Sequence, residues 1–170
     1  SSVFWVIGFG SLSWKFKDRA RAVFQRIKLP WQLKFVLFCT ILALIEEYIA
    51  TAFNNTAPWF GLSSDYAYLT ASSNYLDVIL GHSVIVFVPL FIAWAILLSK
   101  YDFTPGQAFL LFGLSVVIAE ALYGGPSVLL EIAMWIFVYG LMIYLPVYSL
   151  PERKVKNPSP IIFIISVIFP

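Results

Sequence analysis

Long apolar runs alternate with short polar stretches along this chain. Four of the runs contain about 20 residues, the length that an α-helix needs to cross the hydrocarbon core of a bilayer. They cover residues 35–53, 78–99, 104–123 and 126–150. Residues 1–14 and 161–170 are also apolar but too short to cross. The pattern predicts an all-α integral membrane protein, a polytopic helical bundle with about four complete and two partial transmembrane helices in a single domain.

The composition indicates the same class. The chain is 61% hydrophobic and only 12% charged, whereas soluble domains contain roughly 25% charged residues. Cys39 is the single cysteine, so no internal disulfide can form. Because the two short apolar runs meet the ends of the chain, we expect the sequence to be a piece of a longer protein.

Lysine and arginine occur only on alternate connections between the apolar runs. The connections 15–34, 100–103 and 151–160 contain all of them, and the connection 54–77 contains none. Basic residues accumulate on the cytoplasmic side of membrane proteins. We therefore expect the three basic loops to be cytoplasmic and residues 54–77 to be external.

Two of these connections have features of their own. Residues 15–34 mix basic and apolar side chains, which predicts a basic amphipathic helix lying on anionic lipid headgroups. Membrane topology already explains this positive charge, so nucleic acid is not an expected partner. Residues 54–77 form a connection of about 24 residues rich in Ser, Asn and Tyr, and loops of this length are commonly functional. We expect an outer, lid-like loop.

Five ionisable side chains interrupt the apolar runs or lie at their edges. They are Glu46, Glu47, His82, Glu120 and Glu131. A charged group in hydrocarbon costs about 2.5–3.5 kcal/mol on insertion scales, so such residues indicate a functional site by default. At 1.5 Å per residue, Glu47, His82, Glu120 and Glu131 lie within about 9 Å of the predicted outer ends of their helices. We expect these four side chains to converge in one outer-half cavity covered by the lid-like loop, with Glu46 turned toward a neighbouring helix or another wall of that cavity.

Helical spacing indicates the direction of one of these carboxylates. Glu47 shares a small and polar stripe with Ala43 and Thr51, so it should face the bundle interior. Gly113 should let a neighbouring backbone approach closely. Pro89 removes one backbone hydrogen bond, which should kink its helix.

Carboxylates beside a histidine suit a divalent metal such as zinc, iron or manganese. The predicted metal ligands are Glu46, Glu47, His82, Glu120 and Glu131. For acid–base chemistry the candidate catalytic residues are Glu47, His82 and Glu120. The types of residue thus suit a metal site, but their spacing does not match a known metal-binding motif. The sequence contains no HExxH motif and no second histidine.

Three functional classes are consistent with this pattern. The favoured one is a structural or accessory subunit of a membrane complex, whose partners are the bilayer and other membrane subunits. The first alternative is an intramembrane enzyme, metal-dependent or acid–base, acting on a lipid-like substrate at the outer-leaflet Glu/His site. The second alternative is an ion or proton-coupled transporter, in which a buried carboxylate alternates between charged and neutral forms.

Overall fold

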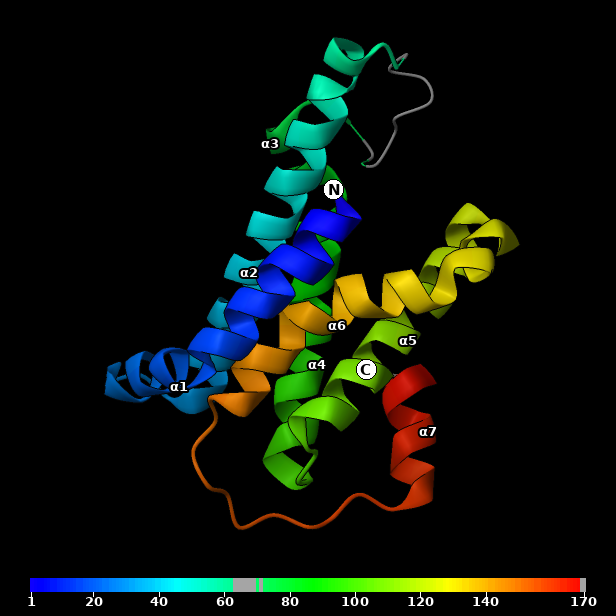
Figure 1. Ribbon diagram of the computed structural model, residues 1–170. Helices are drawn as coiled ribbons and strands as arrows, with labels where there is room; N and C mark the ends of the chain where they lie inside the picture. Colours follow the sequence, from blue (N-terminus) through cyan, green and yellow to red (C-terminus); the bar gives the residue numbers. More distant parts are fainter. Residues whose placement is uncertain (63–69, 71, 169–170) are drawn as a thin grey trace.

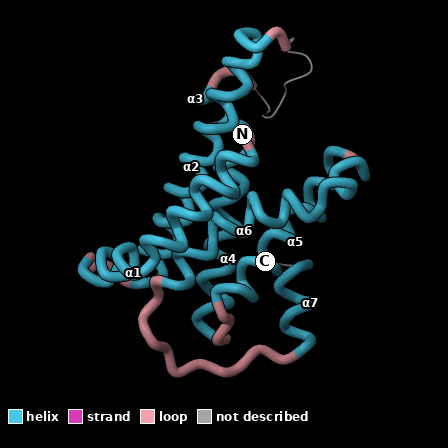
Figure 2. The backbone as a smooth tube through the Cα atoms, in the orientation of Figure 1, coloured by secondary structure: helices cyan, strands magenta, loops and turns pink. Residues whose placement is uncertain are grey.

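The computed structural model describes residues 1–62, 70 and 72–168 and is helical over almost all of them (Figure 1, Figure 2). These residues contain no β-strand, and their extended pairing is limited to an isolated bridge between Tyr101 and Lys156. The predicted all-α class is confirmed. In chain order the elements are η1 (Phe4–Phe9, π-helical), α1 (Gly10–Arg26), α2 (Trp31–Thr56), η2 (Ala57–Phe60, 3-10), α3 (Tyr75–Gly81), α4 (Ser83–Lys100), α5 (Pro105–Gly124), η4 (Pro126–Glu131, 3-10), α6 (Ile132–Tyr148) and α7 (Pro160–Ile168).

Four helical stretches are long and apolar enough to cross a membrane, judged by length and composition. They are Trp31–Phe60, Ser83–Lys100, Pro105–Leu122 and Leu129–Tyr148. Each coincides with one of the four apolar runs identified in the sequence. Between 33% and 50% of each apolar window is buried inside the molecule, so half or more of every window is at least partly exposed.

The N-terminal region differs from the prediction, because it forms one continuous helix instead of an apolar segment followed by a separate loop. η1 passes into α1 at Gly10, which has helical dihedrals of −59° and −45°. Main-chain helical hydrogen bonds do not depend on side-chain polarity, and Pro30 is the first proline of the chain. The helix ends at Ile27, where the backbone is extended. The Lys34 ammonium donates to the carbonyls of Phe24 and Ile27, which lack helical partners.

The N-terminal helix is anchored on α6 through a buried tryptophan. Trp5 is 1% exposed, and its indole N–H donates to the carbonyl of Val138 at 3.0 Å. The Trp5 ring stacks on Phe9, with ring centroids 4.2 Å apart. A buried indole needs a hydrogen-bond acceptor, and the α6 backbone supplies one here. The first apolar run is therefore attached to α6 through Trp5, whereas Val3, Phe4 and Ile7 are exposed.

The apolar run 78–99 contains a break that the sequence did not predict. α3 ends at Gly81 and α4 starts at Ser83, because His82 adopts non-helical dihedrals of −135° and −92°. Pro89 lies inside α4, seven residues beyond the break. The expected kink at Pro89 is thus not what divides this run.

The connection before α3 is described only in part. α2 continues to Thr56 and is followed by η2, while residues 63–69 and 71, within the predicted lid, lie outside the described residues. The Asn55 side chain donates to the carbonyl of Ser73 at 3.0 Å. The hydroxyl of Tyr75 donates to the carbonyl of Leu44 at 2.7 Å. These two bonds hold the start of α3 against α2.

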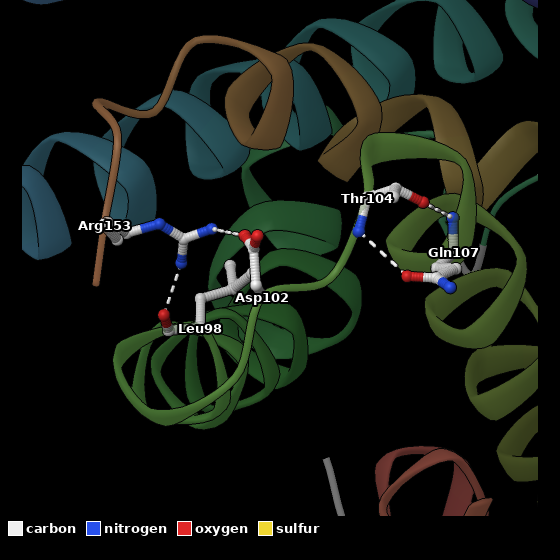
Figure 3. Close-up of polar contacts among 5 residues, drawn as sticks. All are labelled: Leu98, Asp102, Thr104, Gln107 and Arg153. Atoms are coloured by element: carbon white, nitrogen blue, oxygen red, sulfur yellow. Dashed lines mark hydrogen bonds and ion pairs between the residues drawn. The ribbon is translucent and has the colours of Figure 1, made fainter. Parts of the chain in front are cut away.

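α5 and α6 form an antiparallel hairpin that turns at Gly125, whose φ is 97°. A Cβ atom added at Gly113 would lie 2.6 Å from the carbonyl oxygen of Ile136. Only glycine permits so close a backbone approach, as its position in the apolar run predicted. α5 begins with a capping box in which Thr104 and Gln107 satisfy each other's backbone N–H groups (Figure 3).

The basic connections meet at one end of the molecule. The Arg153 guanidinium donates to the carbonyl of Leu98 and lies 3.3 Å from the Asp102 carboxylate (Figure 3). It also lies over the Trp31 ring, 5.4 Å from its centroid. Burial holds the pKa of Arg153 below its usual range, and the Asp102 charge partly opposes that shift. The backbones of Asp102 and Lys156 are hydrogen-bonded at 2.8 Å. We call these contacts the Arg153 latch.

The helices converge at the latch end and diverge at the other. In Figure 1 the far end of the α5–α6 hairpin points away from the far end of α2. Near the latch, the rings of Phe91, Trp94 and Phe112 are fully buried between α4 and α5. These rings form an aromatic core, with Phe91 and Phe112 centroids 5.5 Å apart.

Candidate functional site

α2 carries a buried carboxylate. The Glu47 residue is 8% exposed, and the residues on its stripe, Ala43 and Thr51, are also buried. The predicted orientation of Glu47 toward the interior is thereby confirmed. Glu46, the preceding residue, points to a different side of α2 because consecutive helical residues are rotated by about 100°, and it is half-buried.

Side chains from three other helices surround this pair. The hydroxyl of Ser83, the first residue of α4, lies near the Glu47 carboxylate. Glu120 of α5 is near enough to Glu47 for their charges to interact. The Tyr139 hydroxyl of α6 lies 3.5 Å from Glu120 Oε1 and within electrostatic range of both α2 glutamates. We call Glu46, Glu47, Glu120, Ser83 and Tyr139 the carboxylate cluster.

The remaining predicted site residues do not join this cluster. His82 occupies the break between α3 and α4, and its side chain is exposed. Glu131 is also exposed, at the end of η4 where α6 begins. In the part of the chain that the structure describes, no three His, Cys, Asp or Glu side chains are placed to hold a metal ion. The predicted metal centre at Glu46, Glu47, His82, Glu120 and Glu131 thus has no support from the geometry.

Sequence reasoning missed two members of the cluster. Ser83 directly follows His82, and the non-helical backbone at His82 brings Ser83 rather than the histidine toward Glu47. Tyr139 lies in a strongly apolar helix with several other aromatic residues, so composition did not distinguish it. The sequence did contain one signal for Tyr139. Tyr139 follows Glu131 by about two helical turns, which places it deeper in the predicted span than Glu131.

The charges in the cluster are mainly of one sign. Among the residues described, the single ion pair is Arg153–Asp102, at the opposite end of the helices. Like charges in a poorly solvated site repel one another, and a proton or cation bound between them relieves that repulsion. The cluster can therefore hold a proton on a carboxylate oxygen, with the hydroxyls of Ser83 and Tyr139 as nearby hydrogen-bonding groups.

Comparisons of the chain with protein-family models, with curated proteins and with solved structures find no match in any of the three. The functional interpretation accordingly depends on the geometry of the helices and of the carboxylate cluster.

Proposed function

We propose that the chain is a multi-pass integral membrane protein that acts as a structural or accessory subunit of a larger membrane complex. In this proposal α2, α4, α5 and α6 cross the bilayer, and η1–α1 and α7 contribute partial crossings. The outward-facing apolar surface of the four long helices supports a lipid environment. In water, exposed apolar surface of this extent is an association liability.

The orientation in this proposal places the Arg153 latch at the cytoplasmic face. The positive-inside rule supports it, because all lysines and arginines belong to loops 15–34, 100–103 and 151–160. The contacts of Arg153 with Asp102 and Trp31 also support it, because they bring these three loops together at one end of the molecule. The connection 54–77 then faces outward.

The single observation that carries the accessory role is the outer end of the α5–α6 hairpin. Leu122 is 80% exposed and Leu130 is 88% exposed, and Glu120 of the same hairpin is also exposed. Lipid can cover the leucines, but the Tyr139 hydroxyl at 3.5 Å leaves the Glu120 carboxylate exposed, and a charged group at this depth costs about 2.5–3.5 kcal/mol. A partner helix that packs on this end would cover the leucines and hydrogen-bond Glu120.

Site-specific photo-crosslinking tests the accessory role in native membranes. A benzophenone amino acid at position 122 should yield a discrete adduct with another protein. The matched control is position 110, because Leu110 is another exposed leucine of α5, 56% exposed and nearer the latch. Absence of any protein adduct at position 122, together with a monomeric mass for the detergent-purified chain, would contradict the proposal.

A second candidate, acid–base catalysis or proton- or cation-coupled transport, is favoured by one observation. Glu46, Glu47 and Glu120 all come within electrostatic range of the Tyr139 hydroxyl. Elemental analysis of purified protein, repeated on the Glu47→Gln variant, tests cation binding by the cluster. A stoichiometric ion that the variant loses would favour this candidate, and its metal-dependent form in particular, over the accessory role.

A further inference from the structure

A groove separates the N-terminal helix from the α5–α6 hairpin near the latch end of the molecule. Its volume is about 520 Å³, which falls within the roughly 300–1,000 Å³ of typical small-molecule sites. Val6 and Gly10 line one wall, and Phe109, Phe137 and Leu141 line the other. The walls are thus apolar, and they are supplied by helices from opposite ends of the chain.

One polar group in the groove wall lacks a partner. Ser13 lines the groove and is 4% exposed, and its Oγ atom has no hydrogen-bond partner. Leaving a buried hydroxyl without a partner destabilises the protein. A ligand that presents a hydrogen-bond acceptor along an otherwise apolar body would satisfy it.

The rim of the groove is basic. Trp14 lines the groove, and the Lys17 ammonium lies 3.7 Å from the centroid of the Trp14 ring. Lys17 also approaches the Tyr148 ring, 5.3 Å from its centroid, and Arg21 lies 5.9 Å from the same centroid. Asp18 accepts a hydrogen bond from the Tyr148 hydroxyl at 2.7 Å, so the rim bears two positive charges and one negative.

We propose that this groove binds an anionic lipid of the cytoplasmic leaflet. The acyl chain occupies the apolar groove, an ester carbonyl accepts from Ser13, and the headgroup phosphate lies at Lys17 and Arg21. This inference depends on the membrane orientation proposed above. A flexible apolar chain suits the walls, and each basic residue near the surface adds about 1 kcal/mol of attraction to anionic lipid.

Native mass spectrometry of the detergent-purified full chain tests the inference. The probes are phosphatidylglycerol and phosphatidylcholine with identical acyl chains, titrated separately. One phosphatidylglycerol should bind per chain, and phosphatidylcholine should bind about tenfold more weakly. The Lys17→Gln variant should lose about fivefold in affinity for phosphatidylglycerol alone. Lys100→Gln is the control, because Lys100 is an exposed basic residue of a different loop at the same end.

Filling the groove should abolish binding of both lipids. Gly106 lines the groove, and a Cβ atom added there meets no atom within 4 Å, so Gly106→Leu places a side chain in the groove without a backbone clash. Ser11→Leu is a second variant, because Ser11 is an exposed residue of the α1 wall. Gly8→Leu is the matched control, since Gly8 has equally open surroundings in η1 outside the groove.

Three outcomes would overturn the inference. The first is unchanged lipid binding in both groove-filling variants, and the second is equal affinity for the two lipids. The third is conversion of an oligomer to a monomer by Gly106→Leu, because that would identify a second copy of the chain as the occupant of the groove. A failure of the membrane proposal itself can be distinguished from these outcomes. In that case alkaline carbonate would release the protein from membranes, whereas the three outcomes above are measured on protein that stays in the membrane fraction.

Discussion

The latch end and the outer end of these helices are built from similar apolar sequence but are held together differently. At the latch end, Trp94 and Phe112 are fully buried with ring centroids 6.3 Å apart, and the Arg153 latch ties the loops together. At the outer end, Glu47 is buried but Glu120 is exposed, and the hairpin diverges from α2 (Figure 1).

This difference separates two tasks within one helical unit. Aromatic packing gives each buried ring many close contacts, so the latch end should supply most of the stability. The outer end contains the polar groups and leaves apolar surface uncovered, so it should supply the surface for a partner or a ligand. Four changes test this division.

The largest expected effect is the presence or absence of chemical labelling, which reports on which side of the membrane each end of the helices lies. Cysteines introduced as Phe60→Cys and Lys100→Cys, in a Cys39→Ala background, occupy the outer and latch ends. Both native residues are exposed, whereas Cys39 is fully buried. An impermeant thiol reagent applied outside intact cells should label position 60 and leave position 100 unlabelled. Labelling of position 100 from outside would invert the proposed orientation.

The next effect is a loss of stability at the latch end. Trp94→Ala removes a fully buried indole from the aromatic core and leaves a cavity, which should lower the free energy of unfolding by about 3–5 kcal/mol. Trp59→Ala is the control, because Trp59 is 81% exposed and should change it by less than about 0.5 kcal/mol. Denaturant titration in detergent measures both. Comparable losses from the two variants would remove the distinction between the ends.

A moderate effect is expected where α5 meets α6. Gly113→Leu forces a side chain against the Ile136 carbonyl, so the helices must separate, at a cost of about 1–3 kcal/mol. Gly8→Leu meets no neighbouring atom within 4 Å and should be nearly neutral. The same titration applies. A neutral Gly113→Leu would mean that the hairpin is not held by close backbone contact.

The smallest effect is expected at the carboxylate cluster. Glu47→Gln keeps an oxygen acceptor near Ser83 and removes one charge from a group of carboxylates, so the free energy of unfolding should change by less than about 1 kcal/mol. Ser83→Ala provides the comparison, because it removes the donor and keeps the charge. A loss of roughly 3–5 kcal/mol in Glu47→Gln would instead indicate a buried cationic partner for the carboxylate.

Much of the fold could be predicted because hydrophobicity summed over a helical turn is a local property of the chain. The four membrane-length helices and the inward face of Glu47 follow from spacing within one segment. The break at His82 could not be predicted in this way, because no spacing within the apolar run 78–99 distinguishes His82, whose backbone is non-helical, from its helical neighbours.

The sequence by itself determined which segments are helical and apolar, where the basic residues lie, and which helices carry ionisable groups. The tertiary structure decided which of those groups meet. Glu47 and Glu120 come together with Ser83 and Tyr139, while His82 and Glu131 remain outside, because the rotation and tilt of each helix are set by contacts between helices. Such contacts depend on pairs of residues far apart in the chain, and no pattern within a single segment contains them.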